Sequence, residues 1–270
     1  MNAPTLLPLI DIQSQQDHRN LPIQAVGIKS VRYPVCLRGP SGDAHSVASW
    51  TMTVGLPAHV KGTHMSRFIE LLEASRAPMT LQGLVDMTQD MLRRLDATTG
   101  RLELRFPYFV RKAAPVSGVE SLLDLEAGWR CEINAPGAAP VLGLWATVAA
   151  TSLCPCSKEI SAYGAHNQRS HITMDVSLAQ PMDLEDLVHI AEHSASCAVY
   201  GLLKRVDEKH VTERAYENPK FVEDLVRDVA LALSADRRVS RYDIEVENFE
   251  SIHNHSAFAR IGGHRVDRTT

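Results

Sequence analysis

The sequence lacks several features that would assign the protein to a broad class. Its 270 residues carry a formal charge of −4 and have a pI near 6.3, so no overall basic field attracts nucleic acid. The N-terminal stretch MNAPTLLPLI has two prolines and no basic region, unlike a secretory signal. The longest mostly apolar run, residues 141–153, is shorter than the roughly 18–20 residues of a membrane span. We therefore expect a cytoplasmic protein with no nucleic-acid or membrane partner.

Cysteine and glycine patterns exclude two further classes. The five cysteines are an odd number in a chain without an export signal, which argues against a disulfide framework and predicts reduced thiols. No Walker A or GxGxxG string occurs, so a glycine loop that cradles phosphates is absent. A polyanionic ligand would need local basic side chains instead.

The apolar spacing predicts an α+β protein built from two similar units. Residues 1–22 have no sustained period and are expected to form an irregular arm. The predicted strands are 26–37, 46–54, 102–110, 122–133, 141–153, 172–178, 240–246 and 257–261, with a turn at Pro40, Ser41, Gly42 and Asp43. The predicted helices run through Phe68–Leu72, through 81–95 with Thr80 as N-cap, and over 184–203 and 219–233. This order is ββααββ twice, in units 23–138 and 139–270.

The link between the fifth and sixth predicted strands, residues 154–171, is unusually long and rich in reactive side chains. Cys154 and Cys156 offer thiolates, and His166 and His171 offer imidazoles, which zinc and similar divalent ions prefer. The Cys-Pro-Cys spacing is not CxxC, so an open catalytic site fits better than a closed structural site. The alternative is that a cysteine ending an apolar strand is only a small buried hydrophobe. For Cys36, Cys131 and Cys197, which lie inside strand or helix patterns, that plainer interpretation is favoured.

Several long motifs resemble one known family. SLCPCSKEIS followed by GAHNQRSH, then DEKHVTERAYENPKFVEDLVRD and IHNHSAFA, occur in the order found in type IB GTP cyclohydrolases. The resemblance runs from about Asp17 to His264. It implies a tunnelling fold with antiparallel sheets and helices on one face, assembled as a homotetramer.

The resemblance also implies a metal site. Cys154 and His166, twelve residues apart, and Glu208 would be the protein ligands, with water or substrate in the open position. Zinc, manganese and iron all suit such a set, and Cys156 stays open as the alternative thiolate. A divalent ion lowers the pKa of water toward neutrality, which would supply the nucleophile for C8 of the guanine.

Other residues receive roles by the same resemblance. Glu223 would anchor the purine through a bidentate pair of charge-assisted bonds, although a solvated glutamate in a first helical turn is the alternative from the sequence alone. His253 and His255, with Glu250 shortly before them, would carry protons during ring opening and closure.

The triphosphate of GTP requires basic side chains. The candidates are Lys158, Arg169, His64 and Arg67, with Arg19 and Lys61 as further possibilities. Each alone is indistinguishable from a solvated surface charge.

The expected function is therefore hydrolysis of GTP at C8, formate release and closure to 7,8-dihydroneopterin triphosphate, the first step of tetrahydrofolate biosynthesis. A related tunnelling-fold nitrile reductase, with Cys154 as the nucleophile and a nicotinamide cofactor, is one alternative. A non-catalytic purine or pterin binder is the other.

Overall fold

One twisted antiparallel sheet organises the chain. The computed structural model describes residues 11–13, 15–39 and 42–265. The strands are paired in the order β1-β2-β3-β4-β5-β6-β8-β9, and the two-residue β7 pairs with β5. Their bounds are β1 Ile23–Gly39, β2 Gly42–Leu56, β3 Gly100–Ala113, β4 Glu120–Ile133, β5 Val141–Leu153, β6 Asn167–Leu178, β7 Cys197–Ala198, β8 Val239–Phe249 and β9 Ala257–His264.

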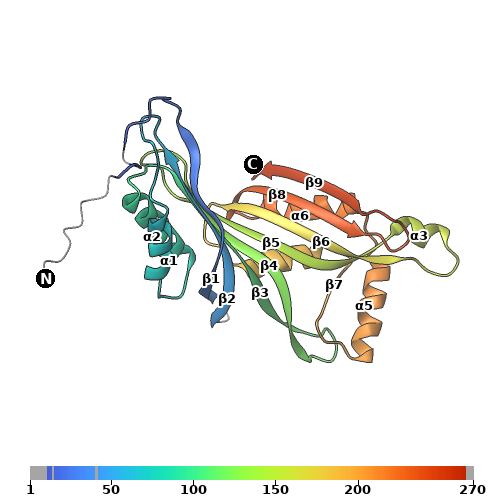
Figure 1. Ribbon diagram of the computed structural model, residues 1–270. Helices are drawn as coiled ribbons and strands as arrows, with labels where there is room; N and C mark the ends of the chain where they lie inside the picture. Colours follow the sequence, from blue (N-terminus) through green and yellow to red (C-terminus); the bar gives the residue numbers. More distant parts are fainter. Residues whose placement is uncertain (1–10, 14, 40–41, 266–270) are drawn as a thin grey trace, which may run out of the picture.

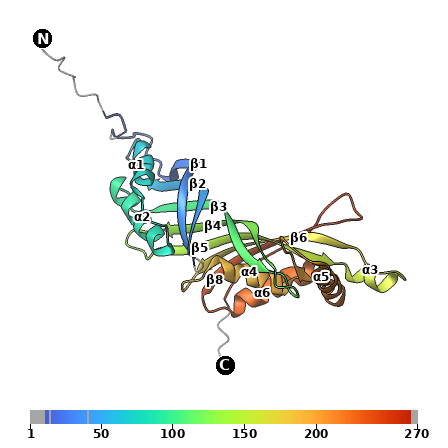
Figure 2. The ribbon, with the colours of Figure 1, turned by 90° about the horizontal axis from the view of Figure 1, so that it is seen from below.

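The helices lie on one face of this sheet and at its ends, in three pairs. Figures 1 and 2 show α1 and α2 at one end of the molecule, α4 and α6 beneath the middle of the sheet, and α3 and α5 at the other end. The bounds are α1 Ser66–Ala74, α2 Leu81–Arg94, α3 Pro155–Ile160, α4 Leu184–Ser194, α5 Arg205–Glu217 and α6 Val222–Ala235. Within the described residues, no helix is long and apolar enough to cross a membrane.

Alternating burial explains why the strands form a half-covered sheet. Along β3, Leu102, Leu104 and Phe106 are fully buried under the helices, while the side chains between them are more exposed. This period of two places apolar side chains on the helix-covered face and polar side chains on the open face. The same alternation along β6 decides which of its residues reach the candidate site.

The predicted fold class is confirmed, and the structure corrects three details. The link 154–171 is not a continuous loop, because it contains α3 and β6 begins at Asn167. The predicted helix 184–203 ends at Ser194, since the following residues turn back and Cys197 pairs with β5. Residues 205–217, which were not predicted to be helical, form α5.

Smaller expectations have mixed outcomes. Thr80 is the N-cap of α2, where its side chain accepts a hydrogen bond from the Gly83 N–H at 2.9 Å. Residues 1–10 of the predicted arm and Pro40 and Ser41 of the predicted turn lie outside the described residues. The described part of the arm forms a β-bridge from Gln16 to Val60. The division into two units at 138 and 139 stays a prediction, because the sheet continues through β4 and β5.

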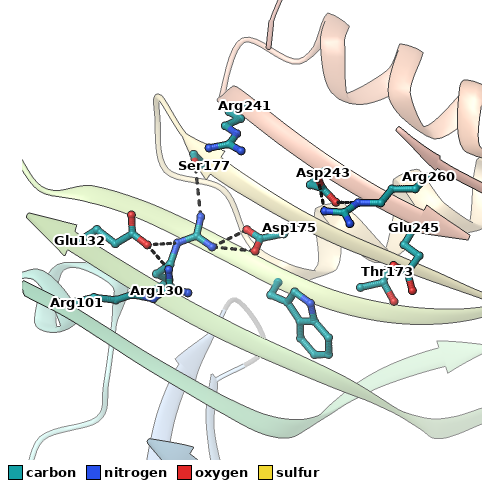
Figure 3. Close-up of a pocket in the computed structure, with 11 residues that line it drawn as sticks. Arg101, Arg130, Glu132, Thr173, Asp175, Ser177, Arg241, Asp243, Glu245 and Arg260 are labelled. Atoms are coloured by element: carbon teal, nitrogen blue, oxygen red, sulfur yellow. Dashed lines mark hydrogen bonds and ion pairs between the residues drawn. The ribbon is translucent and has the colours of Figure 1, made fainter. Parts of the chain in front are cut away.

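The open face carries a charged groove of about 500 Å³ (Figure 3). Its centre is Arg130 of β4, whose guanidinium passes over β5 and donates to Asp175 of β6 at 2.6 Å and to Ser177 at 3.3 Å. A Cβ at Gly143 of β5 would lie 2.7 Å from Arg130 Nη2, so only glycine leaves room for this crossing. The ion pair between Arg130 and Asp175 joins β4 and β6, which belong to the two predicted halves.

Candidate metal and purine site

The candidate site forms where β5 and β8 end and β6 begins, on the helix-covered face. Just before these ends, the buried face changes from apolar to polar at Ser152, Ser170 and Asn248. The Ser170 hydroxyl donates to Asn248 Oδ1 at 2.6 Å and lies 2.7 Å from the Ser152 hydroxyl. All three residues are at most 2% exposed. This buried chain of hydrogen bonds fixes the three strand ends relative to one another.

Cys154 and His166 are held together by Ser157. Cys154 is the N-cap of α3, and its Sγ accepts a hydrogen bond from the Ser157 N–H at 3.4 Å. The Ser157 hydroxyl donates to the Cys154 carbonyl and accepts from the His166 N–H, both at 3.2 Å. The Cys154 N–H in turn donates to the His166 carbonyl at 3.1 Å. Cys154 is half-buried, whereas Cys156 is exposed.

The imidazole of His166 faces side chains from β6 and from the end of β8. Its Nδ1 lies 3.0 Å from Gln168 Oε1, 3.4 Å from Ser251 Oγ and 3.9 Å from Glu250 Oε2. Gln168 Nε2 is 3.5 Å from Glu250 Oε1. The structure thus places Glu250 against the predicted metal ligand.

Glu208 lies on the exposed side of the first turn of α5, next to a buried anchor, Asp207. Asp207 accepts hydrogen bonds at 2.6–2.9 Å from Val116, Ser117 and Lys204, and the first two belong to the turn between β3 and β4. Burial alone would raise the pKa of this carboxyl. The hydrogen bonds outweigh burial and hold the pKa well below its usual range.

The first turn of α6 brings Glu223 to the same end of the sheet. The Lys220 N–H donates to the Leu153 carbonyl at 3.0 Å, which links the approach to α6 with the residue before Cys154. Glu223 is exposed in this first turn. Lys158 also points to this region, but its Nζ donates to the Tyr216 carbonyl of α5 at 2.5 Å.

Other predicted residues are not brought to this cluster within one chain. His64 is 3.3 Å from Asp11, and Arg67 donates to the Arg94 carbonyl at 2.6 Å, both at the α1 and α2 end (Figure 1). Arg169 alternates with Gln168 along β6 and therefore lies on the open face.

The three other predicted candidates, His171, Arg19 and Lys61, contact residues outside this cluster. His171 also lies on the open face, where its ring contacts Phe249 at 4.8 Å. Arg19 pairs with Asp17, and Lys61 donates to Gln15 at 3.1 Å.

His253 and His255 lie in the exposed loop between β8 and β9. Their rings are stacked, with centroids 5.1 Å apart and planes inclined by 12°. The two imidazoles therefore lie face to face on this loop.

The donor set fits a divalent ion in part. A thiolate and an imidazole from one short segment are the right ligand types. Among the residues that the structure describes, however, no three His, Cys, Asp or Glu side chains converge closely enough to hold a metal. Cys131 and Cys197 are buried and suit apolar packing better, because burial raises the pKa of their thiols.

Sequence reasoning missed Ser157, Gln168 and Asp207. Ser157 stands three residues after Cys154, which is the spacing of an N-cap contact, so the motif itself held that signal. Gln168 could have been found only by extending the alternating pattern of β6 toward its start. Asp207 has no sequence signal that separates it from a solvated carboxylate in a first helical turn.

Comparison with known proteins decides the family. The sequence profile of the family described as "Type I GTP cyclohydrolase folE2" matches residues 9–259. The chain belongs to this family. FolE2 is the type IB family, so the resemblance seen in the motifs is confirmed.

Two FolE2 relatives show how complete the match is. "GTP cyclohydrolase FolE2 1" of Dechloromonas aromatica (strain RCB) is 60% identical over 264 residues, which cover 97% of this chain and 99% of the relative. "GTP cyclohydrolase FolE2" of Cupriavidus necator is 61% identical over 261 residues, covering 97% and 96%.

Solved structures support the fold of this FolE2 family member. The uricase from Arthrobacter globiformis aligns with a TM-score of 0.52 over 97% of this chain and 98% of the uricase, at 9% identity. At this identity the likeness shows the fold alone. Urate oxidases have the tunnelling fold, so the expected fold is confirmed.

Proposed function

We propose that the protein is a metal-dependent GTP cyclohydrolase that opens the imidazole ring of GTP at C8. Formate is released, and the product closes to 7,8-dihydroneopterin 3'-triphosphate. The observation that carries the proposal is the set of hydrogen bonds that hold Cys154 beside His166. Two of them pass through the Ser157 hydroxyl, and the third joins the Cys154 N–H to the His166 carbonyl. The names of the FolE2 relatives favour this reaction over a nitrile reductase or a non-catalytic binder.

The proposed ligands are Cys154 and His166, with Glu208 as the third. The half-buried Cys154 is the better thiolate candidate than the exposed Cys156, since it caps α3 and accepts a backbone N–H. A divalent ion at this position supplies Lewis acidity, which lowers the pKa of a water molecule toward neutrality. Zinc, manganese and iron all remain compatible with the three ligand types.

Substrate recognition is assigned to Glu223. A carboxylate can accept two hydrogen bonds from the N1–H and 2-amino groups of guanine, and such charge-assisted pairs fix both position and orientation. Glu223 is exposed near the start of α6, and Lys220 ties that segment to the residue before Cys154. The purine would then lie between the start of α6 and the end of β5.

Proton transfer is assigned to His253 and His255, with Glu250 at the start of their loop. Histidine titrates near neutral pH, and ring opening and closure require several proton transfers. The two rings are stacked on an exposed loop, while Glu250 contacts His166 and Gln168 at the base of that loop. Protons can therefore be delivered from one side of the purine.

A homotetramer would complete the binding of the triphosphate. Arg67 is in α1 and His64 shortly precedes it, and α1 lies at the opposite end of the molecule from α3, which Cys154 caps (Figure 1). The two edges of the sheet are β1 and β9. Pairing of edges between copies would bring the α1 end of one subunit toward the site of another. Sedimentation equilibrium at four times the 29.8 kDa chain mass would support this assembly, and a monomer would refute it. We also propose a cytoplasmic location, where GTP is available.

The decisive assay measures formate and fluorescent pterin from GTP after metal reconstitution. We expect Cys154→Ala and His166→Ala to abolish both products and to reduce bound metal, because each removes a ligand. Matched controls are Cys156→Ala and His171→Ala, which change the same residue types outside the proposed set. Full turnover in the first two variants, or loss confined to the controls, would refute the site.

A further inference from the structure

Three oxygen atoms surround one nitrogen of the His166 ring. Gln168 Oε1 is 3.0 Å from Nδ1, Ser251 Oγ is 3.4 Å away and Glu250 Oε2 is 3.9 Å away. Gln168 is only 7% exposed, and the side chains of His166 and Glu250 are 15% and 12% exposed. Nδ1 therefore sits in a shielded environment of oxygen atoms. Within the described part of the chain, Nε2 of His166 has no hydrogen bond or ion pair.

The orientation of the Gln168 amide follows from its other partner. An ionised carboxylate only accepts hydrogen bonds, so the end of the amide that faces Glu250 must be its NH₂ group. The structure has this arrangement, with Gln168 Nε2 3.5 Å from Glu250 Oε1. The amide oxygen then faces His166 and can only accept. A neutral imidazole has one N–H, so the hydrogen lies on Nδ1 and the lone pair on Nε2.

The backbone holds this chain of side chains in place. Gln168 is in β6, and Glu250 directly follows β8, which pairs with β6 up to Arg169 and Phe249. Ser170 and Asn248, one pair further into the sheet, lock the same two strands through their buried side chains. The distance between the amide and the carboxylate is therefore set by the strand register.

We propose that Gln168 is a positioning residue that holds His166 as the Nδ1–H tautomer, so that Nε2 is ready to bind a divalent cation. The proposal rests on the metal role of His166 given above, and it assigns Glu250 the task of orienting the Gln168 amide. A hydrogen bond on the far nitrogen of a metal-binding histidine fixes both its tautomer and its ring orientation. Losing such a partner lowers metal affinity by about 10- to 100-fold.

The first test reads the tautomer in the metal-free protein. Histidine labelled with ¹⁵N, observed at alkaline pH where the ring is neutral, distinguishes Nδ1–H from Nε2–H by the two nitrogen shifts. The His166 signals are assigned by their loss in His166→Gln. We expect Nδ1–H in the wild type and a shift toward Nε2–H in Gln168→Met, which keeps the bulk and removes both polar atoms. Ser251→Ala, which removes the more distant oxygen, is expected to keep Nδ1–H.

The second test measures Mn²⁺ and Zn²⁺ affinity of the same variants by competition with a chelating dye. Gln168→Met is expected to bind about 10- to 100-fold more weakly than the wild type, and Ser251→Ala within about threefold. An Nε2–H tautomer in the wild type overturns the proposal. So does an unchanged tautomer or an unchanged metal affinity in Gln168→Met, even if thermal stability falls, because a merely structural role would move stability alone.

The two proposals fail in different ways. If the reconstituted wild type releases no formate from GTP while the tautomer and the metal affinity respond to Gln168→Met, the proposed reaction is wrong and the positioning role stands. If formate is released and neither quantity responds, the positioning role is wrong and the reaction stands.

Discussion

Removal of the Ser170 hydroxyl should destabilise the sheet beneath the candidate site. In Ser170→Ala the methyl group fits the same space, but the Ser152 hydroxyl loses its partner and Asn248 Oδ1 loses its donor. All three positions are at most 2% exposed, so water does not readily replace the missing bonds. Each buried polar group left without a partner costs about 1–3 kcal/mol. Since the alanine no longer buries a hydroxyl of its own, we expect a net loss of about 2–4 kcal/mol.

The assay is equilibrium unfolding in urea together with thermal unfolding followed by circular dichroism. A loss of about 2–4 kcal/mol corresponds to a fall in Tm of roughly 5–15 °C for a domain of this size. The urea midpoint should fall with an unchanged slope, because the surface exposed on unfolding stays the same. The matched control is Ser177→Ala on the same strand, whose hydroxyl accepts a hydrogen bond from Arg130 on the open face at 3.3 Å. It should change stability by less than about 0.5 kcal/mol.

A double-mutant cycle separates the network from general effects of the substitution. Ser170→Ala and Asn248→Ala should be less than additive together, because either one alone breaks the same hydrogen bond. Equal stability of Ser170→Ala and Ser177→Ala would refute the reasoning. Full additivity in the cycle would do so as well.

Three further variants probe other contacts. Gly143→Ala should lower the free energy of unfolding in urea by about 1–3 kcal/mol, since its Cβ would lie 2.7 Å from Arg130 Nη2 and 2.9 Å from a backbone oxygen. Wild-type stability in this variant would contradict the close passage of Arg130 over Gly143. Asp207→Asn should lower the urea midpoint at pH 7, and the difference in unfolding free energy between the variant and the wild type should become smaller below about pH 4. The folded protein lowers the pKa of Asp207, so the ionised carboxylate stabilises the fold at pH values above the ordinary aspartate pKa, and this stabilisation is lost when the carboxylate is protonated. A stability difference that does not change with pH would count against this. Glu223→Gln should weaken GTP binding in calorimetry while bound metal stays constant, and an unchanged KM and kcat would remove its anchoring role.

The sequence predicted most strands but not α3 or α5, for physical reasons. The strands have a strict alternation of buried and exposed residues, as along β3, and this signal survives without tertiary information. Helix α5 buries only Asp207 and Ala215, so it has almost no apolar stripe to detect. It is held by contacts that are distant in sequence: Asp207 accepts hydrogen bonds from the turn between β3 and β4, and Ala215 packs against Leu153 and Cys197. Helix α3 is only six residues long and begins at a cysteine cap that is a rare N-cap type.

The candidate site was predicted as a set of residues rather than as an arrangement. Cys154 and His166 are close in sequence, and hydrogen bonds through Ser157 hold their backbones together. The contact of Glu250 with His166 depends on the pairing of β6 with β8, across 84 positions of chain. The alternation of residues within one strand does not specify how β6 is aligned with β8. The sequence therefore could not reveal which side chains surround the imidazole of His166.

The Asp207 anchor has a consequence for how the protein could be divided. The proposed ligands all lie after residue 139, yet the helix that presents Glu208 is fastened to Val116 and Ser117 in the first half. A fragment of the second half alone would keep every proposed donor atom, but Asp207 would lose its hydrogen bonds from Val116 and Ser117, and α5 would keep its packing against Leu153 and Cys197. Gene fusions or split versions of this enzyme should therefore preserve the hairpin of the first half, so that Glu208 keeps its native position.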